Sequence, residues 1–177
     1  GAGKGTQCKR LTAKYPITHL SAGDLLRAEQ KREGSKDGAL IANLIKEGKI
    51  VPAEITVRLL LNAMRADPHR VFFIDGFPRS EENRSNWYIQ ADESGINTAM
   101  CVCIDVSRET MRKRVLGRAV NSGRADDNEI SMMKRFTTFE TETSVVLNKF
   151  DAIGKLFRVS GEGSVDEVFA ALDAFME

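Results

Sequence analysis

Apolar and polar positions follow two alternating patterns along the chain. Short, continuous apolar runs predict buried strands at residues 17–20, 71–75, 100–105 and 155–160. Between and beyond these runs, apolar positions recur at helical spacing, which predicts helices over residues 7–14, 22–33, 38–47, 52–66, 80–93, 108–116, 128–150 and 165–176. Strand followed by helix, repeated along a chain, predicts parallel βαβ units with right-handed crossovers. The sequence therefore predicts an α/β fold built on a parallel sheet.

Length and charge narrow the classes of protein that fit this pattern. The 177 residues suffice for one domain, and the formal net charge of +1 gives no global field that would favour nucleic acid or an acidic membrane surface. No apolar run approaches the roughly 20 residues of a membrane span. The three cysteines form neither a disulfide framework nor a zinc set. We expect a monomer in the cytoplasm, with the nucleus as the alternative compartment, and any anion site must be local.

The chain opens on a glycine-rich run, GAGKGTQCKR. Residues 1–6 align with the second half of a Walker phosphate loop, whose backbone N–H groups cradle phosphate oxygens. Lys4 would then reach the terminal phosphates of a nucleoside triphosphate. Two features depart from the motif: Gly5 occupies the usual Ser or Thr position, and the first glycine and its preceding strand are absent. The alternative interpretation is a flexible N-terminus.

The stretch HLSAGDLLRAE, residues 19–29, predicts an anion pocket at a strand end. Ser21 or Asp24 would cap the helix that carries Arg27, so a helix N-terminus and a guanidinium group would lie close together. Taken by itself, an arginine such as Arg27 is more often a solvated helix arginine, which is the alternative interpretation.

A second strand end carries FFIDGFPRSEEN, residues 72–83. The buried strand would deliver Asp75 to its carboxyl end, where a carboxylate can hold a magnesium-bound water. Gly76 allows close approach of the backbone, and Pro78 is expected to begin the next helix just before Arg79. The alternatives are a structural cap for Asp75 and a surface salt bridge for Arg79.

Four arginines, Arg114, Arg118, Arg124 and Arg135, surround the segment GRAVNSGRADDN at residues 117–128. Their guanidinium groups would repel one another unless anions came between them. Phosphoryl transfer spreads negative charge over the moving group, and a lid carrying arginines would stabilise that charge and exclude water. The alternative is a solvated basic loop neutralised by its own aspartates.

In these ordered motifs the sequence resembles the nucleoside monophosphate kinases, the adenylate kinase-like family, and most closely the UMP-CMP kinase branch. The resemblance runs from GAGKGTQC through HLSAGDLLR, EGKIVPAEIT, IDGFPR and SGRADDN to SVDEVF, nearly the whole chain. It implies a single domain over residues 1–177, with a P-loop NTPase-type parallel sheet flanked by helices. It also implies an acceptor-binding helical insertion at about residues 21–51 and a short lid at about residues 117–127.

The resemblance implies roles for individual residues. ATP would be bound by Gly1, Ala2, Gly3, Lys4, Gly5, Thr6, Arg114, Arg118 and Gly163. The acceptor monophosphate would be bound by Ser21, Arg27, Lys49, Ile50, Val51, Gly76, Arg79, Asn83, Arg124 and Arg135. The catalytic set would comprise Lys4, Asp75, Arg79, Arg118, Arg124 and Arg135, with Mg²⁺ held by Asp75 through water. Gly5 in the Ser or Thr position is normal in this family, where the metal is held largely through water.

The family also implies a central parallel strand before Gly1. Without this strand its neighbours would expose backbone donors and acceptors, so we expect that the natural protein contains residues ahead of the printed sequence. A literal 177-residue chain should fold poorly.

Two positions indicate the acceptor base. Asn83 lies one helical turn beyond Arg79 and offers both a donor and an acceptor to cytosine or uracil, whereas adenylate kinases usually carry glutamine there. Ala22 agrees, because adenylate kinases commonly have threonine at its position. The resemblance therefore implies reversible transfer of the ATP γ-phosphate to CMP, UMP and, we expect, dCMP. The alternatives are an adenylate kinase acting on AMP and an inactive nucleotide-binding relative.

Overall fold

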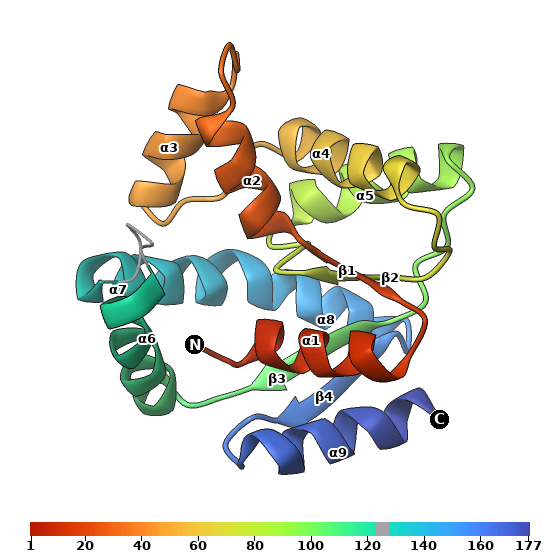
Figure 1. The fold of residues 1–177 in the computed structure, drawn as a ribbon, viewed down its shortest axis with the longest axis vertical. Helices are drawn as coiled ribbons and strands as arrows, with labels where there is room; N and C mark the ends of the chain where they lie inside the picture. The colour runs from red at the N-terminus through yellow and green to blue at the C-terminus, as the bar shows by residue number, and fades with distance from the viewer. Residues whose placement is uncertain (123–127) are drawn as a thin grey trace.

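The computed structural model describes residues 1–122 and 128–177, and its strands form two parallel pairs (Figure 1). β1 (Thr18–Ser21) pairs with β2 (Phe72–Asp75), and β3 (Cys101–Asp105) pairs with β4 (Leu156–Ser160). The four predicted strands are confirmed, each within one residue at either end. Within the described residues no ladder joins the two pairs. The strand expected ahead of Gly1 concerns residues outside the sequence and stays a prediction.

Helices surround the two strand pairs (Figure 1). They are α1 (Lys4–Lys14), α2 (Ala22–Lys31), α3 (Gly38–Lys46), α4 (Ala53–Ala66), α5 (Glu81–Glu93), α6 (Arg108–Ser122), α7 (Glu129–Thr138), the π-helical turn η1 (Phe139–Thr143), α8 (Ser144–Ala152) and α9 (Val165–Met176). None of the helices in the described part of the chain is long and apolar enough to cross a membrane.

Three helix boundaries differ from the sequence prediction. α1 begins at Lys4 because the backbone turns at Gly3, whose φ is +85°, and not at residue 7. α6 continues past residue 116 to Ser122, since a helix interior tolerates a glycine such as Gly117 at a cost of about 1 kcal/mol. The single helix predicted over residues 128–150 is divided by η1 and ends at Ala152.

The start of α5 also differs from prediction. Pro78 does not begin this helix, because it follows Phe77 through a cis peptide bond and lies before the helix. Ser80 is the cap instead: its hydroxyl oxygen accepts the backbone N–H of Asn83 at 3.1 Å. Arg79 therefore lies in the loop between β2 and α5, at the carboxyl end of the strand.

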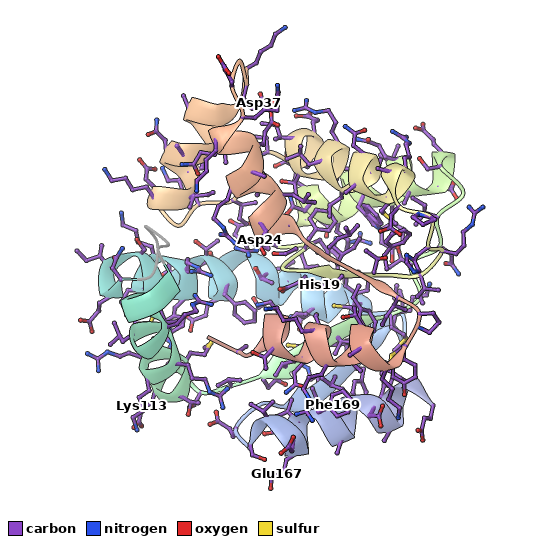
Figure 2. The ribbon with its side chains drawn as sticks, in the orientation of Figure 1. His19, Asp24, Asp37, Lys113, Glu167 and Phe169 are labelled. Atoms are coloured by element: carbon purple, nitrogen blue, oxygen red, sulfur yellow. The ribbon has the colours of Figure 1, made fainter. Side chains whose placement is uncertain are left out.

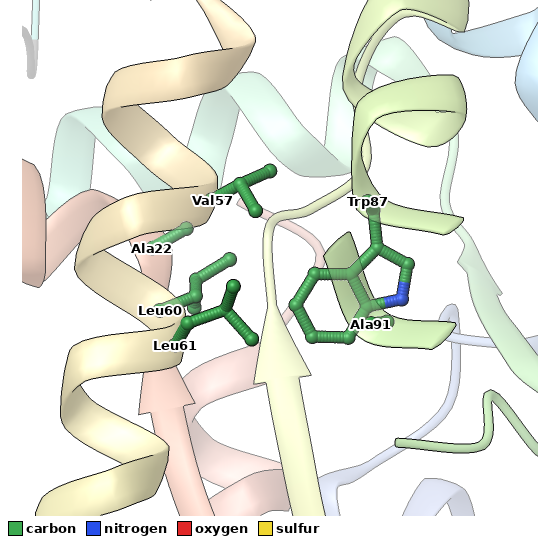
Figure 3. Packing of buried hydrophobic residues seen from close by; sticks show 6 residues of the cluster. All are labelled: Ala22, Val57, Leu60, Leu61, Trp87 and Ala91. Carbon is green, nitrogen blue, oxygen red and sulfur yellow. The ribbon is translucent and has the colours of Figure 1, made fainter. Parts of the chain in front are cut away.

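The largest core cluster lies between α4, α5 and the β1–β2 pair (Figure 3). Val57 and Leu60 are fully buried, and the Trp87 side chain, 4% exposed, fills the space opposite them. The indole N–H of Trp87 donates to the hydroxyl of Thr98 at 2.9 Å, so the ring is buried without a lost hydrogen bond. This cluster holds the two helices against the strands whose carboxyl ends carry the candidate site.

A second cluster joins α1 and α9 to β4 through Leu11, Ile17, Val159, Val168 and Leu172. Figure 1 shows α1 beside the β1–β2 pair and α9 beside β4, and the two helices pack against each other. The first turn of α1 is thereby fixed relative to both strand pairs.

α2 and α3 form a separate projection above the β1–β2 pair (Figure 1). A small cluster of Ile41, Val51 and Ile55 fixes α3 to the start of α4. At the end of α2, the Glu29 carboxylate accepts two hydrogen bonds from Arg32, both at 2.8 Å, and one from the Ser35 hydroxyl at 2.7 Å. The bond to Arg32, followed by that to Ser35, lowers the pKa of Glu29 to about 2.

We predict that Glu29→Gln destabilises the protein at pH 7 and that the loss shrinks on acidification. The pKa of Glu29 is lower in the folded state than its ordinary 4.5, so its contribution is full above pH 4.5 and disappears as pH falls towards 2. Urea denaturation of wild type and variant from pH 7 to pH 3 measures the difference. Glu33→Gln, at an exposed glutamate nearby, is the control. A difference that stays constant with pH would contradict the prediction.

Candidate active site

The N-terminus of α1 forms a nest of backbone donors. Gly3 caps the helix in the left-handed conformation and supplies no side-chain cap hydrogen bond. The N–H groups of Lys4, Gly5 and Thr6 therefore lie in a first turn where no intrahelical acceptor exists. A Cβ on Gly3 would have open space around it, so glycine is needed here for the positive φ of the backbone and not to avoid a clash. The same open space leaves room for a ligand. The arrangement suits an anion.

Asp75, at the carboxyl end of β2, lies between two basic groups. Its Oδ1 is 3.7 Å from Lys4 Nζ, and its Oδ2 is 3.5 Å from His19 Nε2. Burial raises the pKa of Asp75, but the interaction with His19 and the charge of Lys4 outweigh burial and leave the pKa below its ordinary value. The carboxylate is therefore ionised at neutral pH and ties α1 to β2 electrostatically.

His19 is a site residue that the sequence interpretation missed. Its interaction with Asp75, and then with Cys8, raises its pKa to about 10, so the imidazolium form predominates at neutral pH. Figure 2 shows His19 on β1 close to α1. The sequence carries no local signal for this contact, because it depends on the pairing of β1 with β2, which places His19 and Ser21 on the face that they share with Asp75.

Arg79 is held by the loop that carries it. Its Nε donates to the carbonyl oxygen of Gly76 at 2.6 Å. Gly76 has φ +78°, and a Cβ there would lie 2.8 Å from Arg79 Nη2. Gly76 therefore serves two needs at once, since the turn requires positive φ and the guanidinium group occupies the space a side chain would take.

The α2 N-terminus presents Arg27 as the sequence predicted. The Ser21 hydroxyl accepts the backbone N–H of Asp24 at 3.3 Å, so Ser21 is the cap. The Asp24 carboxylate instead pairs with Arg27, three residues on. The guanidinium group folds back over Gly23, where a Cβ would lie 3.1 Å from Nη2. Ser21 thus supports the site from the helix end and is not among the residues that line the cavity.

A cavity of about 70 Å³ lies where these elements meet. Eight of the predicted acceptor-binding residues line it: Arg27, Lys49, Ile50, Val51, Gly76, Arg79, Asn83 and Arg135. The structure adds seven others, Ala22, Gly23, Leu26, Ile45, Gly48, Thr56 and Phe77. Most of the added residues supply apolar wall or backbone, which motif reasoning does not single out. The charges of Lys4, Arg79 and Arg135 act on one another, so the cavity adjoins the α1 nest.

Asn83 is 2% exposed, and the oxygen of its side-chain amide is hydrogen-bonded within the protein. Its Oδ1 accepts the backbone N–H of Arg79 at 3.2 Å, while Nδ2 is buried without a hydrogen-bond partner. The sequence interpretation gave Asn83 both a donor and an acceptor for a base. In the structure the acceptor is taken, and the amide N–H₂ group is what remains for a ligand.

The remaining predicted residues lie elsewhere. Arg114 and Arg118, both on α6, are half-buried and are not among the residues lining the cavity. Arg114 acts electrostatically on Glu162, which places it near Gly163 in the loop before α9. A Cβ on Gly163 would lie 2.8 Å from Glu167 Oε2. Arg124 falls within residues 123–127, outside the described part of the chain.

Magnesium can be tested against the acidic groups. Asp75 Oδ1 is buried and has no hydrogen-bond partner, so it could accept from a water bound to a cation. Within residues 1–122 and 128–177, no group of three or more His, Cys, Asp or Glu side chains could hold a metal ion directly. These residues therefore fit a hydrated Mg²⁺ that arrives with a phosphate ligand and contacts Asp75 through water.

The site combines backbone N–H donors at a helix N-terminus, a carboxylate at the adjacent strand end and converging arginines. Together these features define a nucleotide-dependent kinase site in an α/β fold. The chain belongs to the adenylate kinase family, whose model matches residues 1–155. It is 47% identical to the UMP-CMP kinase of Gallus gallus, over 96% of this chain and 88% of the relative. It is 44% identical to the UMP-CMP kinase of Danio rerio, over 100% and 92%, and 45% identical to the uridylate kinase of Saccharomyces cerevisiae, over 96% and 82%.

We predict that Gly76→Ala weakens binding of a nucleoside monophosphate by roughly tenfold or more, because the new Cβ displaces the Arg79 guanidinium group. Isothermal titration calorimetry with CMP and AMP as probes measures the loss. Gly95→Ala is the matched control, since Gly95 has φ +67° with nothing within 4 Å of the added Cβ. Equal losses in both variants would show that backbone strain, and not Arg79, accounts for the effect.

Proposed function

We propose that this protein transfers the γ-phosphoryl group of ATP to a pyrimidine nucleoside monophosphate, CMP or UMP and also dCMP, and releases ADP and the diphosphate. The observation that carries the proposal is the convergence of three guanidinium groups, Arg27, Arg79 and Arg135, with the buried Asn83 amide on one cavity next to Lys4. The curated relatives named UMP-CMP kinase and uridylate kinase support it.

The donor binds at the start of α1. Gly1 to Thr6 surround the ATP phosphates, with the N–H groups of the first helical turn directed at their oxygens. The Lys4 side chain is 45% exposed, with Nζ 3.7 Å from Asp75 Oδ1, and would follow the group that moves. Arg114, Arg118 and the backbone at Gly163 bind the rest of ATP, and Arg124 joins Arg135 between donor and acceptor phosphates.

The acceptor phosphate binds between Arg27 and Arg79. One of its oxygens attacks the γ-phosphorus in line; this P–O bond forms while the bond between the γ-phosphorus and the β,γ-bridging oxygen breaks. The acceptor oxygen is already anionic, so no general base is needed, and no covalent enzyme intermediate forms. The work of the protein is positioning and charge stabilisation, which the cationic groups around the cavity supply.

Mg²⁺ bound with ATP would neutralise and orient its phosphate oxygens. Asp75 would hold this ion through water, and its ionised state at neutral pH suits that role. His19 and Lys4 keep the carboxylate directed towards the start of α1.

The base is read by Asn83. Because Oδ1 is bonded to the Arg79 backbone, the N–H₂ group donates to an acceptor on the pyrimidine edge, and cytosine and uracil both offer one. The same hydrogen bond fixes the position of Asn83 relative to Arg79, the arginine that binds the acceptor phosphate.

The acceptor segment, residues 21–51, moves to admit the substrates. The lid expected at residues 117–127 includes residues 123–127, which lie outside the described part of the chain. A cavity of about 70 Å³ is too small for a nucleotide, since ligand pockets span roughly 300–1,000 Å³. The projecting α2–α3 unit is the element placed to widen it (Figure 1).

A coupled assay of ATP-dependent phosphorylation with CMP, UMP, dCMP and AMP tests the function. We expect turnover of CMP and UMP far above that of AMP. A preference for AMP would assign the chain to adenylate kinase activity. A folded protein that binds nucleotides without turnover would be an inactive relative.

We predict that Asn83→Gln raises KM for CMP and UMP more than KM for ATP. The added methylene pushes the amide into a small cavity and breaks its bond to the Arg79 N–H. Steady-state kinetics with each substrate varied in turn measures the split. Gln90→Asn, at a partly buried position of the same helix where the amide donates to Asn86, controls for a change of amide length in α5. Equal losses on both sides would count against the base contact.

A further inference from the structure

The elements α7, η1 and α8 follow one another and are called the rod here. Two threonine hydroxyls on the rod donate hydrogen bonds to loops that line the acceptor cavity. Thr138 ends α7 and Thr143 ends η1. Thr138 reaches the loop after α3, and Thr143 reaches the loop before α5. These loops come from distant parts of the sequence, so the rod connects two walls of one cavity.

The first contact fixes the wall that carries Lys49, Ile50 and Val51. Thr138 Oγ1 lies 3.0 Å from the carbonyl oxygen of Gly48 and shares its proton with the intrahelical carbonyl of Lys134, also at 3.0 Å. Gly48 itself, at φ +66°, packs against α7: a Cβ there would lie 3.0 Å from Lys134 Cβ and 3.4 Å from the Arg135 backbone nitrogen.

The second contact fixes the wall that carries Arg79. Thr143 Oγ1 donates to the carbonyl oxygen of Arg79 at 2.8 Å. The N–H of Arg79 is bonded to Asn83, and its Nε is bonded to the Gly76 carbonyl oxygen. With the Thr143 bond, the backbone of Arg79 is held on both its N–H and its C=O side.

The π-helical turn explains how one rod makes both contacts. Five residues apart in an α-helix, Thr138 and Thr143 would point about 140° away from one another. In η1 the Ser144 N–H bonds to the Phe139 carbonyl, five residues back, so this turn is wider by one residue. Residues five apart then lie nearly one above the other, and both hydroxyls face the cavity walls.

We propose that Thr138 and Thr143 are positioning residues for the acceptor monophosphate, held on one face by η1. The inference rests on the proposed function for the identity of the substrate. Neither hydroxyl is among the groups lining the cavity, so each acts through backbone carbonyls. Thr138 acts on the loop at residues 48–51, and Thr143 acts on Arg79.

The rod contains a matched control. Thr141 is exposed, lies inside η1 and donates its hydroxyl to the Thr137 carbonyl at 3.0 Å, within the rod. Thr141→Val therefore removes a hydroxyl hydrogen bond that stays within the rod and ends on neither loop. Thr138→Ser and Thr143→Ser keep the hydroxyl and serve as rescue variants.

The experiment compares Thr138→Val, Thr143→Val, Thr141→Val and the two serine variants in steady-state kinetics. Loss of one hydrogen bond should raise KM for CMP and UMP roughly 2- to 10-fold in the first two variants, with KM for ATP unchanged. The serine variants and Thr141→Val should behave like wild type. Equal rises in KM for CMP and ATP, or failure of serine to restore KM, would overturn the proposal.

A second readout needs no turnover. The backbone N–H groups of Gly48 and Lys49 bond to Ile45 and Leu44, at 3.1 and 2.9 Å, and report on the order of this loop. In the protein without nucleotide, Thr138→Val should accelerate their hydrogen exchange roughly 2- to 10-fold, while Thr141→Val leaves it unchanged. Unchanged exchange in Thr138→Val would overturn the role of Thr138. Absence of turnover in wild type, with accelerated exchange in the variant, would contradict the proposed function alone.

Discussion

The parallel pairing of β1 with β2 is the constraint on which the rest of the site depends. Its register places Ser21 opposite Asp75, so the α2 cap and the Asp75 carboxylate end their strands at the same edge. Arg27 follows from the first strand and Arg79 from the second, each within a few residues of that edge. A slip of one residue would turn Asp75 to the other face of the pair and separate it from Lys4 and His19. The core around Val57, Leu60 and Trp87 secures the pairing from outside (Figure 3).

Much of this site could be predicted from the sequence because many of its residues lie where strands end, helices begin or the chain turns. Strand ends, caps and glycines with positive φ have strong local signatures, and the predicted Ser21 cap and the turn at Gly76 have those structures. Eight of the acceptor residues that the family resemblance implied line one cavity. The family match confirmed the class that the motifs had indicated.

What the sequence did not yield depends on contacts between distant segments. His19 looked unpartnered until the pairing brought Asp75 beside it, and Asn83 looked bifunctional until Arg79 took its oxygen. The π-turn was invisible because a helical apolar pattern does not report a one-residue widening. Pro78 was misplaced because a proline just before a helix resembles a proline at its first position, and only the capping bond of Ser80 distinguishes them.

The threonine contacts of the rod end on main-chain oxygens, at Gly48 and Arg79. Main-chain oxygens are present whatever side chain a codon specifies. A lineage could therefore exchange side chains that line the cavity, such as Ala22 and Asn83, while the scaffold that positions them was inherited unchanged. Selection for a new acceptor would act on a few cavity positions. The rod and its two contacts would then be retained in enzymes that no longer share a substrate.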